Sequence, residues 1–139
     1  MSPANRAANV AEEMAHARDA MRAAEALVEL GLTRDAMSRL YYAVFHATLA
    51  VLLSEDLEPT THRGALSLLG LHFVKPGRLP GDMPATFKRI QSYREACDYT
   101  RGFAVPDELA RAELGAVHLY LEVVVRYLEA GGYGGVPAA

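Results

Sequence analysis

Apolar residues recur at helical spacing through the first thirty positions of the chain. Between about Ala7 and Leu30 the apolar positions predict one amphipathic helix, and they are Val10, Met14, Met21, Ala24, Leu27 and Val28. Gly31 can adopt the left-handed backbone of a helix C-cap, and the Thr33 hydroxyl could cap the next helix. Because the break is short, the two helices should run antiparallel.

The second predicted helix, about Arg34 to Ser54, is apolar on nearly every face. It contains the run LYYAVFHATLAVLL, and a helix of this kind belongs at the centre of a bundle. Its rare polar members, Arg39 and His46, lie seven residues apart, which is a rotation roughly 20° short of two full turns. They therefore share one face of the helix, with Tyr42 between them.

Three more helices are predicted after this one. Thr60 or Thr61 can cap a short helix that ends near Phe73. The stretch from Val74 to Pro84 holds three prolines and two glycines, which predict a loop. The last two helices are expected over about Ala85–Tyr99 and from Pro106 to about Ala130.

These elements predict one all-α domain, an up-and-down bundle of four or five helices. The length of 139 residues suits a single domain. No repeat or linker interrupts positions 7 to 130, so the domain is assigned to residues 1–139 with its core at about 7–130. The Gly-rich tail, residues 131–139, is expected to be disordered or loosely packed.

Composition narrows the range of functions. The net charge of −3 gives no global basic field for nucleic acid, so any RNA contact must be local. Cys97 is the only cysteine, which excludes an intramolecular disulfide and a cysteine-cluster zinc site. The histidines lack metal-ligand spacing, and neither a metal nor a cofactor is expected. The N-terminus lacks a signal-peptide core and no membrane span is recognised, so a cytoplasmic protein is expected.

Four segments together resemble the stand-alone prokaryotic HEPN domain family. They are SRLYYAVFHATLAVLL at 38–53, THRGALSLLGLHFVKPGRLP at 61–80, YREACDY at 93–99 and the capped closing helix. The resemblance implies a helical bundle that usually forms a homodimer and is commonly encoded beside a minimal nucleotidyltransferase. Some members are metal-independent ribonuclease toxins, and others bind the substrate of the nucleotidyltransferase, so the family alone does not fix the activity.

The ribonuclease motif of the toxic members is incomplete in this chain. That motif is an Arg followed four to six residues later by a His. Arg94 aligns with its arginine, but Asp98 and Tyr99 stand where the histidine would fall. Arg39 and His46 carry an Arg and a His on the central helix, and they correspond to the family's second-helix signature. The resemblance also raises adenylylation of a tyrosine such as Tyr99 by the partner.

Arg39, Tyr42 and His46 form the first candidate cluster. A guanidinium on an otherwise apolar helix must be paired or face solvent, because its desolvation costs several kcal/mol. One interpretation is a polar pocket for a phosphate or nucleotide. The other is a structural network that joins Arg39 to a carboxylate such as Asp98.

The remaining candidates lie on the shorter helices. His62 is placed in the first turn of its helix, where the dipole favours a neutral imidazole and a bound anion, although an exposed helix-start histidine is the simpler interpretation. Arg94 and Asp98 are four residues apart and could form an ion pair or part of a site. Tyr99 could stack on a base or be a core tyrosine with a solvated hydroxyl.

Two hypotheses follow for the function. In the first, the chain is a ribonuclease toxin in which His46 or His62 activates a ribose hydroxyl, while Arg39 and Arg94 stabilise charge on the phosphate. In the second, the same residues, with Tyr42, Asp98 and Tyr99, bind a nucleotide or dock the nucleotidyltransferase without catalysis. The missing histidine after Arg94 favours the second hypothesis, and the retained Arg39 and His46 favour the first.

Overall fold

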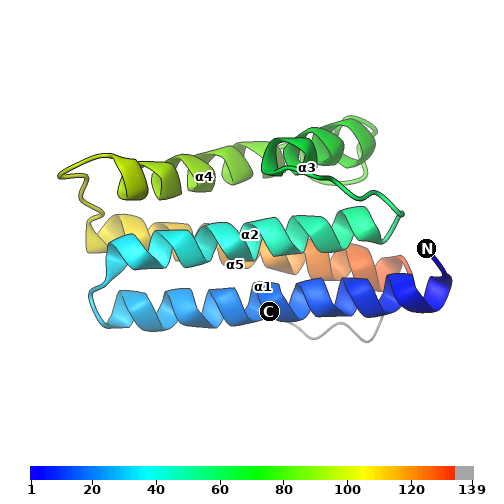
Figure 1. The fold of residues 1–139 in the computed structure, drawn as a ribbon, viewed down its shortest axis with the longest axis horizontal. Coiled ribbons are helices and arrows are strands. Elements are labelled where there is room, and N and C mark those ends of the chain that lie inside the picture. The colour runs from blue at the N-terminus through cyan, green and yellow to red at the C-terminus, as the bar shows by residue number, and fades with distance from the viewer. Residues whose placement is uncertain (134–139) are drawn as a thin grey trace.

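The computed structural model describes residues 1–133, and its regular structure is helical throughout that range (Figure 1). The elements are α1 (Pro3–Glu29), α2 (Thr33–Leu53), α3 (His62–Leu69), the π-helical turn η1 (Gly70–Val74), α4 (Met83–Tyr99) and α5 (Asp107–Ala130). No strand occurs in the described range. The prediction of an all-α bundle of four or five helices is confirmed, with five α-helices in the described range.

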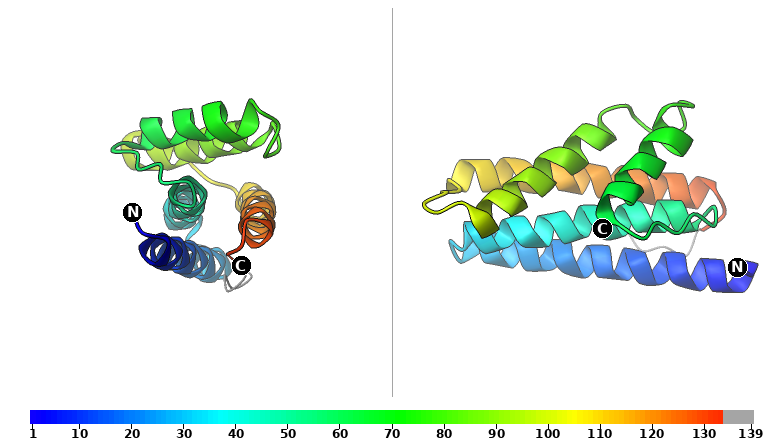
Figure 2. Two further views of the ribbon diagram at one scale, coloured as in Figure 1. Left: turned by 90° about the vertical axis from the view of Figure 1, so that its right-hand side faces the viewer. Right: turned by 45° about the horizontal axis from the view of Figure 1, so that its top comes forward.

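The helices form two layers, as the end-on view shows (Figure 2). The first layer is a triangle of α1, α2 and α5, with α1 farthest from the second layer, in which α3 and α4 cross over α2. The helix α2 is the only one that contacts all four other α-helices within the described part of the chain. The two helices α1 and α2 run antiparallel, as the short break predicts (Figure 1).

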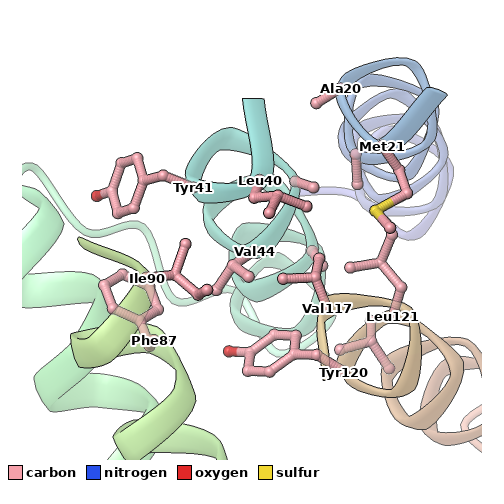
Figure 3. Close-up of a cluster of buried hydrophobic side chains, with 14 of the residues drawn as sticks. Ala20, Met21, Leu40, Tyr41, Val44, Phe87, Ile90, Val117, Tyr120 and Leu121 are labelled. Atoms are coloured by element: carbon pink, nitrogen blue, oxygen red, sulfur yellow. The ribbon is translucent and has the colours of Figure 1, made fainter. Parts of the chain in front are cut away.

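The core forms where the two layers meet on α2 (Figure 3). Leu40 and Val44 of α2 lie between Phe87 and Ile90 of α4 on one side and α5 on the other, and all four side chains are fully buried. A polar tie crosses the core as well, because the Thr48 hydroxyl donates to the Val44 carbonyl and lies 2.6 Å from the Tyr120 hydroxyl. Since Thr48 has one hydrogen to give, Tyr120 is the donor of that second bond.

Polar contacts at the periphery hold the second layer in place. Arg89 of α4 donates from two nitrogens to the buried carboxylate of Glu113 on α5, at 2.7 and 3.1 Å. Arg78, in the loop between η1 and α4, bonds to Glu55 beyond α2 and to the Tyr127 hydroxyl of α5. The Gly- and Pro-rich loop is therefore fixed at its centre rather than free.

Several predicted local features are confirmed and others are wrong. Gly31 has a φ of +76°, and the Thr61 hydroxyl accepts from the Gly64 amide at 2.8 Å as an N-cap. Thr33 is not the cap expected for the second helix, because its hydroxyl instead donates to the Val105 carbonyl at 2.7 Å. The fourth helix begins at Met83 rather than Ala85, since Pro84 fits the first turn.

The C-terminal tail is packed as far as Tyr133, contrary to the expectation for its first residues. Tyr133 packs against the core, and its hydroxyl donates to the Ser54 carbonyl at 3.1 Å. Residues 134–139, the rest of the predicted disordered tail, lie outside the described range.

The central helix is also long and apolar enough to cross a membrane by length and composition. Its most apolar window has a mean hydropathy of 1.3, and 61% of that window is buried inside the bundle. Central helices of folded bundles meet the same criterion, because burial against other helices selects the same residues as burial in lipid.

Leu121 and Leu119 of α5 provide a matched test of this packing. Leu121 is fully buried, whereas Leu119 is 63% exposed. We expect Leu121→Ala to lower the free energy of unfolding by about 2–5 kcal/mol, because it removes buried methyl groups and leaves a cavity. Leu119→Ala should change it by about 0.5 kcal/mol or less. Denaturant unfolding followed by circular dichroism measures both, and equal losses would contradict this assignment of the core.

Candidate functional site

Arg39, Tyr42 and His46 line one hollow on the flank of α2 that faces α1. The hollow has a volume of about 360 Å³, and α1 contributes His16, Asp19 and Ala20 to its wall. The three α2 residues are half-buried, while their neighbours Leu40, Val44 and Ala47 are fully buried. The helix therefore presents its polar side chains to an open space and its apolar side chains to the core.

Two guanidiniums lie close to the Tyr42 ring. The Arg39 Cζ lies 4.8 Å from the centre of the Tyr42 ring, and the Arg94 Cζ lies 5.3 Å from it. Arg94 also donates to the Tyr42 hydroxyl at 3.3 Å. Both distances suit cation–π attraction, which holds the two positive charges close to one another. We call Arg39, Tyr42 and Arg94 the arginine–tyrosine cluster.

Carboxylates neutralise this cluster only in part. Asp98 lies 4.0 Å from Arg94, at the limit of an ion pair. In the described part of the chain no carboxylate lies within 4.0 Å of the Arg39 guanidinium, so the Arg39–Asp98 network considered from the sequence does not form. Among the described residues, Asp19 is the one carboxylate that lines the hollow. Two guanidiniums with little compensation attract an anion.

His46 is held by a carboxylate that the sequence did not single out. Its Nδ1 lies 2.6 Å from the Glu13 carboxylate of α1, and both side chains are about three quarters buried, with exposures of 25% and 21%. A carboxylate can only accept here, so Nδ1 carries a hydrogen. In the neutral ring, Nε2 is then the basic nitrogen, which is the arrangement of an oriented general base. The His16 ring lies 5.2 Å away.

His62 lies on the other flank of α2, beside Tyr41 rather than in the hollow. Its Nδ1 is 2.6 Å from the Tyr41 hydroxyl, and the Phe45 ring centre is 4.3 Å from its own. Burial lowers the pKa of His62 below its ordinary value, and the Arg94 guanidinium lowers that pKa further. The sequence predicts a neutral imidazole from the helix dipole, and the structure gives the same direction through burial and a nearby cation.

Burial also raises the pKa of the Tyr41 phenol. The hydroxyl therefore stays protonated and can donate to or accept from His62. Arg94 lies 5.2 Å from the Tyr41 ring centre as well as beside Tyr42. Arg94 therefore lies beside both flanks of α2, and its positive charge acts on His62 as well as on the hollow.

Asp98 and Tyr99 are not brought into this hollow. Tyr99 is 84% exposed at the end of α4. Asp98 lines a different and larger hollow of about 830 Å³ at the end of the bundle, together with Arg34 and Cys97. That hollow is larger but lacks a histidine and the paired guanidiniums, so we place the candidate site at the smaller one. Within residues 1–133, no group of three metal-binding side chains occurs.

The pKa of His62 tests the contact between Arg94 and the His62 flank. We expect NMR titration of the folded protein to give His62 a pKa below 6.5, its ordinary value. Arg94→Gln should raise this pKa, because the variant removes a positive charge that disfavours the imidazolium. Arg22→Gln, which removes an exposed guanidinium on α1, should leave it unchanged. An unchanged pKa in Arg94→Gln would contradict the described geometry.

Several known proteins are similar to this chain. A protein of Methanocaldococcus jannaschii named "putative toxin" is 37% identical over 84 residues, which cover 60% of this chain and 63% of that protein, slightly under two thirds. A second protein of the same name and organism is 28% identical over 112 residues, covering 81% of this chain and 76% of the relative. A UPF0332 protein of Gloeobacter violaceus is 39% identical over 86 residues, covering 62% and 68%.

The sequence model of the HEPN domain matches residues 10–127, from the third turn of α1 to the last turn of α5. This range contains both flanks of α2 and every residue of the candidate site. The match covers well over half of the chain and agrees with the five-helix fold. The chain belongs to the HEPN domain family.

Proposed function

We propose that this chain is the toxin of a toxin–antitoxin pair, acts as a metal-independent ribonuclease, and is neutralised by a minimal nucleotidyltransferase. The family match and the names of two relatives support a toxin-like role. The nucleotidyltransferase partner rests on the family resemblance. A homodimer and a cytoplasmic location are parts of the same proposal, the latter supported by the single cysteine.

The observation that carries the proposal is an oriented base beside two guanidiniums. The Glu13 carboxylate holds His46 at 2.6 Å, and His46 shares its hollow with Arg39 and Tyr42. Arg94 approaches the same tyrosine from α4. A base and two fixed positive charges are what cleavage of a phosphodiester by its own ribose hydroxyl requires.

The chemistry would proceed without a metal. His46 Nε2 accepts the proton of the ribose 2′-hydroxyl, whose oxygen then attacks the adjacent phosphorus. The bond to the 5′-oxygen breaks, that oxygen takes up a proton, and a 2′,3′-cyclic phosphate is left. Arg39 and Arg94 stabilise the additional negative charge on the phosphate oxygens. We prefer His46 over His62 as the base because His46 lines the hollow with Arg39 and His62 does not.

A second candidate function remains on specific grounds. In toxic members of the family a histidine follows the arginine by four to six residues, whereas this chain has Asp98 and Tyr99 in that place. Neither side chain lines the hollow, which favours binding without catalysis. The cluster would then bind a nucleotide or dock the nucleotidyltransferase without cleaving RNA. The strong exposure of Tyr99 suits contact with such a partner, or adenylylation of its phenolic oxygen with release of pyrophosphate from ATP.

Expression in a bacterial host distinguishes the two functions. We expect the chain alone to arrest growth, and co-expression of the neighbouring nucleotidyltransferase to relieve the arrest. His46→Ala should abolish the arrest and lower RNA cleavage by the purified protein about 10²-fold or more, because general-base catalysis contributes about that much. Glu13→Gln should weaken cleavage as well, since it removes the charge that orients the base.

His118 provides the matched control for this experiment. It also pairs with a glutamate, its Nε2 lying 2.8 Å from Glu25, but it lies on α5 and does not line the hollow. His118→Ala should keep both the arrest and the cleavage. An arrest that persists in folded His46→Ala would reject His46 as the base, and the absence of both arrest and cleavage would favour the binding function.

A further inference from the structure

The second layer of the bundle differs in charge from the first. Residues 62–99, which form α3, η1, the following loop and α4, carry six Arg or Lys against three Asp or Glu. The helices α1 and α5 together carry five Arg against ten Asp or Glu. The whole chain has a net charge of −3, so the basic character of one layer disappears from the total. We call residues 62–99 the basic layer.

Three cations of the basic layer are exposed and unpaired. Arg63, Lys75 and Lys88 are exposed, and within the described residues none of them has a carboxylate within 4.0 Å. By contrast, Arg78 is bonded to Glu55 and Arg89 to Glu113, so their charges are largely compensated. The first three side chains therefore have no carboxylate partner among residues 1–133 and are available to an external anion.

These cations lie along the two helical segments that carry His62 and Arg94. Arg63 directly follows His62, and Lys88 is six residues before Arg94, which is about 9 Å along a helix. Lys75 is twelve residues beyond Arg63, at the far end of η1 and about 20 Å from the His62 end of the layer. A strand of nucleic acid carries several phosphates over such a length. The outer side of α3 and α4 is not covered by another helix (Figure 2).

The surface of the layer is better suited to a phosphate backbone than to a protein. Stable protein interfaces need an apolar centre from which charges are excluded. Leu71 and Tyr99 are the only large apolar side chains of the layer that are exposed in the described structure, and they belong to different helical elements. The Tyr99 ring, 84% exposed, instead offers a surface on which an unpaired base can stack.

We infer that the basic layer binds the backbone of single-stranded RNA and guides it to the arginine–tyrosine cluster, with Arg63, Lys75 and Lys88 contacting phosphates. This inference deepens the proposed function, because RNA is the substrate class of that function. It also explains how an acidic chain can bind a polyanion: the acidic side chains are concentrated on α1 and α5, which form the other layer.

Fluorescence anisotropy with a labelled 20-nucleotide oligouridine measures this binding without any turnover. The test variant is the triple substitution R63Q/K75Q/K88Q, and the control is R22Q/R111Q/R126Q on α1 and α5, which changes the net charge equally. We expect the test variant to bind about tenfold more weakly or worse near 100 mM salt. Its plot of log affinity against log salt should be shallower by about 2, since each lost phosphate contact removes about 0.7.

The control variant should retain most of the affinity and the wild-type salt slope. All six substituted side chains are exposed, and circular dichroism and thermal unfolding should confirm that both variants fold. Equal losses in the two variants, or no binding by the wild type, would overturn the inference. If the wild type does not bind oligouridine but still arrests growth, RNA binding by the basic layer is rejected and the toxin function is not. If binding depends on the three cations but the protein neither arrests growth nor cleaves RNA, the toxin function alone is rejected.

Discussion

The burial of α2 against four other helices is the constraint on which the rest of the structure depends. Its apolar residues fill the meeting point of the two layers, so a polar group on this helix must find a partner or face an opening. Thr48 finds its partners inside the core, in Val44 and Tyr120. Arg39 and His46 cannot do so and lie on the flank beside α1, where a hollow remains. The position of the candidate site thus follows from the packing of the central helix.

Adjacent residues on α2 divide the polar groups between its two flanks. Tyr41 is buried beside His62, whereas Tyr42 borders the hollow with Arg39. Arg94 contacts both rings from α4, because a helix that crosses α2 can reach two neighbouring positions at once. Removal of Arg94 would therefore affect both flanks, while removal of Arg39 would affect only one.

Periodicity and resemblance predicted the helices, the central place of α2 and the common face of Arg39, Tyr42 and His46. They did not predict Glu13 or His16, because a pattern within one helix says nothing about which residues of another helix lie opposite. The predicted antiparallel pairing of α1 and α2 could have been used to find the α1 residues opposite Arg39 and His46. Glu13 and His46 lie at similar distances from the turn at Gly31, as do Ala20 and Arg39, and each pair meets around the hollow.

The difference in charge between the two layers was missed for a related reason. Net charge is a sum over the whole chain, and the sequence passes from the first layer to the second and back again. The acidic helices α1 and α5 are at the ends of the sequence and the basic layer is between them. Folding brings α1 and α5 together in one layer and gathers the net positive charge of residues 62–99 in the other, although Arg89 of α4 pairs with Glu113 of α5 where the layers meet. A polyanion that approaches such a molecule is repelled by one layer and attracted to the other. The polyanion is therefore expected to approach from the side of the basic layer, over His62 and Arg94. The separation of charge between the layers would thus also select the direction from which RNA reaches the site.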